Sequence, residues 1–471
     1  MMTNYPIFMR AAIKIRTLGR SLALLFLLCS GVSAATSSDI VPLSESQALK
    51  LFYQRNLDLL AARYNIDSAQ AQEIIAGAIP NPTIGVQVLE LSNNPNQNSA
   101  AQGCSVAPAG QSHNCGPAEY YSFTQLIEMA GKRGLRMQSS AIATQAAESD
   151  FRDAVRILSN MVRDAYFGLL QAQKVRWLAQ EMVNHYKDIV LSNELRLQAG
   201  AIAESDFLRI NVEALKAQSD LENAQAAVEQ AQANLAVVLN WPNKSMQFAA
   251  DDNWPELKDI GQALPRDALI NKALALRPDL LGDKQRADQA VKDLALARKL
   301  NIPDVTFNAG FARDPSNTVL NSAFLGISVP VPLFYQYQGE TSKAAANLNQ
   351  MRLQAEETEL AVRNDVVNAL ASWKSSNNVI KIYESKLLAQ STAIRDRVEL
   401  GYSKGAVTVL DFIDAERNYK SVMLDYYTNM INRINAYYDL SKSLAVEPDA
   451  ELDQHTEAAT AIDSSRLREI E

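Results

Sequence analysis

Asn56-Leu57-Asp58-Leu59-Leu60 and Arg277-Pro278-Asp279-Leu280-Leu281 carry the same short pattern, and an Ala-Leu pair precedes each of them, at Ala48 and at Ala268. Both stretches have the composition that starts a helix. Similarity between distant segments of one chain is typical of a protein built from repeated structural units. We therefore expect an internal two-fold repeat.

The two halves continue in the same order. Prolines end each expected first helix, in Pro80-Asn81-Pro82 and in Ile302-Pro303-Asp304, and a β-like run follows both of them. Much later, Gly200-Ala201-Ile202-Ala203 corresponds to Gly405-Ala406-Val407-Thr408. The match is weak at single positions but consistent in order, which favours duplication of one unit.

Each half contains two β-like runs in which apolar and polar residues alternate. This period of two is typical of a strand with one apolar and one polar face. In the second half the apolar positions are Val305, Phe307, Ala309 and Phe311, then Leu325, Ile327, Val329 and Val331. In the first half they are Ile84, Val86 and Val88, then Tyr121 and Phe123. The chain is therefore expected to form four strands of membrane-spanning length.

Two segments predict very long helices. Only Gly168 interrupts residues 136–198, and residues 340–400 contain neither Gly nor Pro. Each segment could form one helix of roughly 90 Å at 1.5 Å per residue. Small and aliphatic residues recur at spacings of three and four, as in Ala214, Ala217, Leu221, Ala224 and Val228. This spacing predicts a coiled coil.

The first residues resemble a secretory signal peptide. Four basic residues up to Arg20 precede an apolar stretch over 22–29, and small residues follow around Ala34. We expect cleavage after Ala34. Cys29 leaves a lipidated N-terminus open, although Leu28 before it is larger than a lipidation signal prefers.

The expected organisation has five parts. A signal peptide covers 1–34, and a first structural repeat of helix, strand pair and long helical hairpin covers 35–240. A linker with little regular structure follows over 241–263. The second repeat covers 264–447, and the acidic tail over 448–471 is expected to be disordered.

The charge and the strands limit the possible partners. The net charge of −8 argues against nucleic acid. No later stretch reaches the ~20 consecutive apolar residues of a membrane helix, so entry into a membrane requires strands. Four strands cannot close a barrel, and an open sheet edge in lipid is costly. Several chains must then share one barrel, and three would leave a lumen.

The cysteines predict a disulfide, and the scattered histidines predict neither a metal site nor a catalytic site. After cleavage only Cys104 and Cys115 remain, in a loop-like segment, and such a pair usually forms a disulfide in an oxidising compartment. His113 lies between them, but His185 and His455 are remote, so no metal site is expected. Without clustered catalytic residues or a phosphate-binding loop, we expect neither enzyme activity nor a cofactor.

Four motifs carry a resemblance to a known family. Pro80-Asn81-Pro82-Thr83, Gln125-Leu126-Ile127-Glu128, Gly131-Lys132-Arg133 and Arg277-Pro278-Asp279-Leu280 are similar to motifs of the outer-membrane efflux protein family. They resemble the branch of these TolC-like outer membrane factors that serves cobalt-zinc-cadmium resistance. The order of signal peptide, strand pair, long hairpin and repeat over nearly the whole chain is also similar.

The resemblance implies a mainly α protein with a transmembrane β-barrel: a homotrimer whose twelve-stranded barrel, in contact with outer-membrane lipid, continues into a long α-helical coiled-coil tunnel. It implies location in the bacterial outer membrane, with the tunnel in the periplasm. It further implies partnership with a periplasmic adaptor (membrane fusion) protein and an inner-membrane resistance-nodulation-division pump. The expected function is passive exit of heavy-metal cations. Export of drugs or other small molecules, and a soluble periplasmic coiled-coil adaptor, are the alternatives.

The resemblance also assigns roles at the periplasmic end. Gly200 and Gly405 would mark the hairpin turns that meet the adaptor. Asp411 and Asp414 lie three apart, so they share one helix face, and they match a carboxylate ring at the tunnel entrance. Acids in a first helical turn are also stabilised by the helix dipole without any function. Tyr402 and Asp206 match a hydrogen-bonded pair that holds the coils shut, whereas Val407 stands in place of a gating arginine.

Overall fold

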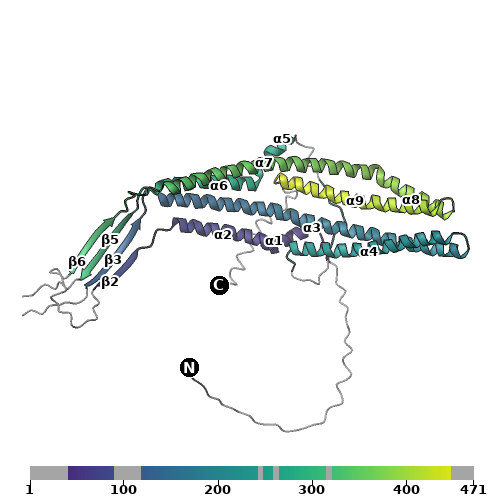
Figure 1. The fold of residues 1–471 in the computed structure, drawn as a ribbon, viewed down its shortest axis with the longest axis horizontal. Helices are drawn as coiled ribbons and strands as arrows, with labels where there is room; N and C mark the ends of the chain where they lie inside the picture. Colours follow the sequence, from purple (N-terminus) through teal and green to yellow (C-terminus); the bar gives the residue numbers. More distant parts are fainter. Residues whose placement is uncertain (1–40, 90–117, 242–247, 258–264, 314–320, 447–471) are drawn as a thin grey trace, which may run out of the picture.

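The computed structural model describes residues 41–89, 118–241, 248–257, 265–313 and 321–446. The protein is elongated, with a four-stranded sheet at one end and two helical hairpins at the other (Figure 1). The expected signal peptide, the acidic tail, Cys104 and Cys115 all lie outside the described residues. Within the described residues, no helix combines the length and apolarity needed to cross a membrane.

Both halves contain the same types of element in the same order. The first half has β1 (Val41–Leu43), α1 (Glu45–Arg55), α2 (Leu57–Gly77), β2 (Thr83–Leu89), β3 (Ala118–Ile127), α3 (Lys132–Gln198) and α4 (Glu204–Val238). The second has β4 (Phe248–Ala250), α5 (Arg266–Leu276), α6 (Pro278–Lys299), β5 (Val305–Arg313), β6 (Asn321–Ser328), α7 (Gln338–Ile382), the π-helical segment η2 (Tyr383–Leu387), α8 (Leu388–Ser403) and α9 (Val409–Ser443).

The single helix expected before each proline segment is in fact two helices. In the first half the joint is Asn56, which is extended (φ −66°, ψ 126°) and caps α2 because its Oδ1 accepts a hydrogen bond from the Leu59 N–H at 2.9 Å. In the second half the joint is Arg277, and the ring of Pro278 disfavours a helical conformation at the residue before it. The proline segments then end α2 and α6 as expected.

The four expected strands are present and form one antiparallel sheet in the order β2-β3-β5-β6. Its register aligns apolar residues in rows on one face, for example Ile84, Phe123, Ala309 and Leu325. Ile84 and Leu325 are 79% and 78% exposed. The other face is mainly small and polar, with Thr124 donating to Asn308 at 3.0 Å. The sheet therefore has a bare apolar face, and its outer strands, β2 and β6, each pair on one side only among the described residues.

The long helices follow the expectation closely. Helix α3 is continuous, and α7, η2 and α8 form one helical path that a π-helical segment interrupts. Helix α3 contacts α2, α4, α6 and α9 along its length (Figure 1). The predicted coiled-coil seam is buried at Ala217, Leu221, Ala224 and Val228. Hairpin α3–α4 and hairpin α8–α9 thus run together to the end remote from the sheet.

The main core lies midway along the molecule. Large buried side chains from both halves meet there, including Phe52, Phe167, Leu235 and Leu280. Strand β4 lies within the segment expected to have little regular structure and pairs in parallel with β1. The Tyr166 hydroxyl fastens this pair, because it donates to the Leu43 carbonyl at 3.0 Å and accepts from the Asp251 N–H at 3.1 Å.

We predict that Asn56→Ala lowers the stability of the purified protein by about 1 to 2 kcal/mol, because α2 loses its cap. The Asn56 Nδ2 also donates to the Val238 carbonyl at 2.9 Å. Asn56→Asp, which keeps the acceptor but loses this donor, should be intermediate. Chemical denaturation measures the free energy of unfolding, with Gln54→Ala at an exposed position of α1 as the control. Equal effects of Asn56→Ala and Gln54→Ala would contradict the capping role.

Candidate functional site

The two hairpin turns have the same geometry. Gly200 and Gly405 adopt left-handed conformations, with φ of +70° and +72°. At the first turn the Gly200 and Ala201 N–H groups donate to the Leu197 and Arg196 carbonyls at 2.9 and 2.8 Å. The second turn repeats both bonds. This is the Schellman motif, in which the left-handed residue is usually glycine. Gly200 and Gly405 therefore each lie in the turn between the two helices of a hairpin.

Arg196 joins the end of the first hairpin to the end of the second. Its guanidinium donates to the Ser403 carbonyl at 2.8 Å and to the Tyr402 carbonyl at 3.4 Å, and lies 5.5 Å from the centre of the Tyr402 ring. Carbonyls in the last turn of a helix lack partners within it. Arg196 therefore satisfies the end of α8 from the neighbouring hairpin.

The Tyr402 hydroxyl donates to Oδ1 of Asn193 at 2.5 Å, and Asp206, the expected partner, is not its acceptor in this structure. Asn193 is oriented for this contact because its Nδ2 donates to the Ile189 carbonyl at 2.8 Å. Both Tyr402 and Asn193 are buried. Burial raises the pKa of Tyr402; the Arg196 guanidinium opposes this rise and the Asp206 carboxylate adds to it. Asp206 thus affects Tyr402 only through its charge.

Asp411 and Asp414 are both exposed near the start of α9. Asp411 belongs to a capping box: its carboxylate accepts from the Thr408 backbone N–H at 3.3 Å, while its own N–H donates to Thr408 Oγ1 at 3.2 Å. The Thr408 hydroxyl also donates to the Asp411 carboxylate, at 2.7 Å. This contact stabilises the start of α9 whether or not Asp411 has a further functional role. Val407 lies in the turn before α9 and packs closely against Gly401 of α8, because a Cβ added at Gly401 would lie 2.5 Å from Val407 Cγ2.

Further contacts between α4 and α9 join the hairpins at positions farther from the two turns. Arg417 donates two hydrogen bonds to the buried Glu213 carboxylate, at 2.5 and 3.2 Å, and Lys420 pairs with Asp220. Hydrogen bonding from Arg417 lowers the pKa of Glu213 despite its burial, and the same bond raises the pKa of Arg417. These groups form successive ion pairs between the two hairpins.

Sequence analysis did not single out Asn193, Arg196, Glu213 or Arg417. The partners of each contact are about half the chain apart; Arg417 and Glu213, for example, are separated by 204 positions. Charged residues on a long helix usually pair locally or face solvent. The only available signal was their position within a few turns of the duplicated glycines. The predicted Cys104–Cys115 disulfide lies outside the described residues.

Solved structures have a fold similar to this antiparallel sheet joined to two long hairpins. The outer membrane channel CmeC of Campylobacter jejuni is similar to this chain with a TM-score of 0.73 at 16% identity, covering 88% of this chain and 89% of that one. The family model described as outer membrane efflux protein matches residues 48–240 and 269–446. The chain therefore belongs to the outer membrane efflux protein family.

Two named relatives are similar to this chain over most of their length. The cobalt-zinc-cadmium resistance protein CzcC of Cupriavidus metallidurans is 23% identical over 82% of this chain and 86% of its own length. The pyoverdine export outer membrane protein OpmQ of Pseudomonas putida is 22% identical over 84% of this chain and 85% of its own length.

We predict that Tyr402→Phe destabilises the hairpin end by about 1 to 3 kcal/mol, because the buried Asn193 carbonyl oxygen loses its donor. The stack of the Tyr402 ring on Phe412, with centroids 4.9 Å apart, should survive. Chemical denaturation in a double-mutant cycle with Asn193→Ala measures the coupling, and Tyr64→Phe on α2 is the control. An equal loss with and without Asn193→Ala would mean that the two side chains do not interact.

The Glu213–Arg417 pair should make stability depend on pH. Folding lowers the pKa of Glu213, so its stabilisation is present above the ordinary value of 4.5 and is lost as the pH falls through the folded-state value below it. We expect Glu213→Gln to be less stable than wild type at pH 7, on the order of 1 kcal/mol because Arg417 is half exposed.

The measurement is the free energy of unfolding of wild type and Glu213→Gln between neutral pH and pH 3. The difference should shrink as the pH falls, and Arg417→Gln should reproduce this trend. A difference that grows on acidification would have the wrong sign for this pair.

Proposed function

We propose that three copies of this chain form an outer-membrane channel-tunnel through which an efflux pump passively discharges heavy-metal cations. The observation that carries this proposal is the amphipathic sheet with two unpaired edges. In lipid each unsatisfied backbone group costs several kcal/mol, so the edges of β2 and β6 need partners. Joining β6 of one copy to β2 of the next satisfies both edges, since the sheet contains four strands.

Three copies are favoured over two by the size of the resulting barrel. Two copies would give eight strands, and a barrel of about that size is filled by its own side chains. Three copies give twelve strands and leave a lumen. The apolar rows of the sheet, including Ile84 and Leu325, would then face lipid, and the face with Thr124 and Asn308 would line the pore.

Exposed apolar residues on the helices support the tunnel. Leu191 and Leu195 on α3 are each 62% exposed, and Leu208 and Leu215 on α4 are 51% and 60% exposed. Extended apolar surface on a single chain usually marks a protein interface. We propose that neighbouring copies cover these residues and that the internal repeat lets both hairpins pack around one axis. A soluble adaptor would not require the bare apolar sheet.

The hairpin ends would form the gate. In a trimer, Asp411 and Asp414 from each copy would ring the periplasmic entrance, while the Tyr402–Asn193 hydrogen bond would help to keep the second hairpin against the first. The turns at Gly200 and Gly405 would face the periplasmic adaptor, which connects the channel to a resistance-nodulation-division pump.

The substrate proposal combines similarity and charge. CzcC is named for resistance to cobalt, zinc and cadmium. A ring of carboxylates at a constriction attracts cations and repels anions, which favours metal cations. Export of an organic molecule is the second candidate, because OpmQ is named for pyoverdine export.

Single-channel recording in planar bilayers tests both the channel and its gate. Wild type should conduct with cation selectivity and be blocked by multivalent cations, whereas the double variant Asp411→Asn, Asp414→Asn should lose much of both properties. Asparagine retains an oxygen that can accept from Thr408, so the capping contact has a substitute. Glu357→Gln, an exposed acid on α7, is the matched control.

Two results would count against these proposals separately. A purified protein that never conducts would contradict the channel. A conducting double variant with wild-type selectivity and block would contradict only the carboxylate ring.

A further inference from the structure

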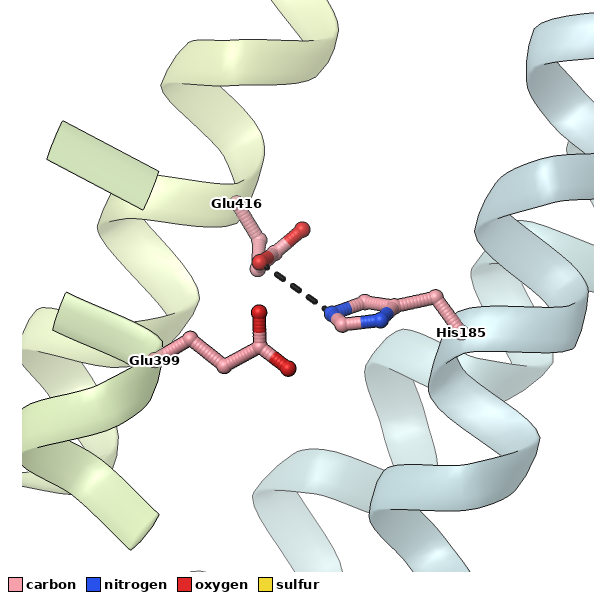
Figure 2. Close-up of side chains that lie close together, drawn as sticks. All are labelled: His185, Glu399 and Glu416. Carbon is pink, nitrogen blue, oxygen red and sulfur yellow. Dashed lines mark hydrogen bonds and ion pairs between the residues drawn. The ribbon is translucent and has the colours of Figure 1, made fainter. Parts of the chain in front are cut away.

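Three side chains that could bind a metal ion converge between the two hairpins. His185 comes from α3, Glu399 from α8 and Glu416 from α9, and one potential ligand atom of each lies within 4.8 Å of the others. Figure 2 shows both carboxylates turned towards the same ring nitrogen of His185. The scattered histidines of the sequence predict no metal site, but the fold brings two glutamates beside His185.

Glu416 is a buried carboxylate with incomplete hydrogen bonding. Its side chain is 1% exposed, and its Oε1 lies 3.2 Å from His185 Nε2. Its Oε2 is also buried and has no hydrogen-bond partner among the described residues. A buried carboxylate is costly unless it is paired or bound to a metal. Glu416 therefore indicates that a further positive group belongs at this position.

The neighbouring cation leaves this requirement unmet. Arg395 pairs with the adjacent Asp396 at 2.9 Å, and its guanidinium lies 4.1 Å from the centre of the Tyr419 ring. One imidazole and two carboxylates together form a set of nitrogen and oxygen ligands that suits a divalent transition-metal cation.

We propose that His185, Glu399 and Glu416 bind a divalent transition-metal cation such as Zn²⁺. Zinc bonds to histidine nitrogen and carboxylate oxygen at about 2.0 to 2.2 Å, so tetrahedral ligands lie roughly 3.3 Å apart. The separation of 3.2 Å between His185 Nε2 and Glu416 Oε1 fits that spacing. Glu399 is half-buried and can approach by a change of side-chain rotamer. Water would complete the coordination.

The bound ion would act as a clip between the hairpins of the two halves. His185 belongs to the hairpin α3–α4, and both glutamates belong to the hairpin α8–α9. The site lies on the same side-by-side hairpins as the Tyr402–Asn193 and Glu213–Arg417 contacts, so metal binding would add a further connection to them. This inference does not rest on the proposed function, because a cation can bind whether or not the protein conducts.

The test uses the full chain, purified and freed of metal by a chelator, and titrated calorimetrically with zinc sulfate at neutral pH. Wild type should bind about one zinc ion per chain at this site. Glu399→Gln and His185→Asn should each weaken binding roughly tenfold or more. Because Glu399 is only half-buried, its variant should keep the fold, which circular dichroism checks. Excess Mg²⁺ should not displace zinc, because imidazole prefers transition metals.

Matched controls separate this site from other possible ligands. His113→Asn and His455→Asn should leave the affinity unchanged. X-ray absorption of the zinc complex should show nitrogen and oxygen ligands without sulfur, which excludes Cys104 and Cys115. Absence of zinc binding, wild-type affinity in Glu399→Gln or His185→Asn, or sulfur in the zinc coordination would overturn the proposal.

Discussion

The unpaired edges of the four-stranded sheet constrain the rest of the molecule. Among the described residues, the outer edges of β2 and β6 have no neighbouring strand, and large apolar side chains between them, such as Ile84 and Leu325, are exposed. A sheet of this kind is unstable as a free surface in water and has unsatisfied edges in lipid. Closure by further copies would remove both problems, and this is the physical basis of the proposed trimer.

The hairpin ends lie far from this sheet, at the opposite end of the long helices. Helix α3 alone has 67 residues, or roughly 100 Å at 1.5 Å per residue. At the hairpin end, polar contacts join the two hairpins directly. Arg196 donates to the α8 carbonyls, Tyr402 donates to Asn193, and Arg417 donates to Glu213. These polar contacts lie beside a buried apolar cluster that includes Tyr186 and Ile210 from the first hairpin and Phe412 from the second. In the proposed gate, the two hairpins would break both kinds of contact when they separate.

Periodicity was sufficient to predict the long helices and the four strands of the antiparallel sheet, because the residues that set them are neighbours in sequence, but it did not predict the short strands β1 and β4. The alternation at 305–311 predicted β5, and the glycines at 200 and 405 predicted the turns. The joint at Asn56 was missed because a single capping side chain makes it. The site was only partly predictable. Tyr402 binds Asn193 rather than Asp206, and His185 meets Glu416, 231 positions away, through folding alone.

Disulfide trapping between sheet edges tests the proposed closure most directly. In a Cys104→Ser, Cys115→Ser background, single cysteines at Ile84, Val86 or Val88 on β2 are combined with single cysteines at Ala323, Leu325 or Ile327 on β6. Each doubly substituted protein is oxidised in its native membrane and separated by size without reductant. The account predicts that combinations in register yield covalent species up to a trimer and none larger. Monomers alone in every combination, or ladders that extend beyond three chains, would contradict it.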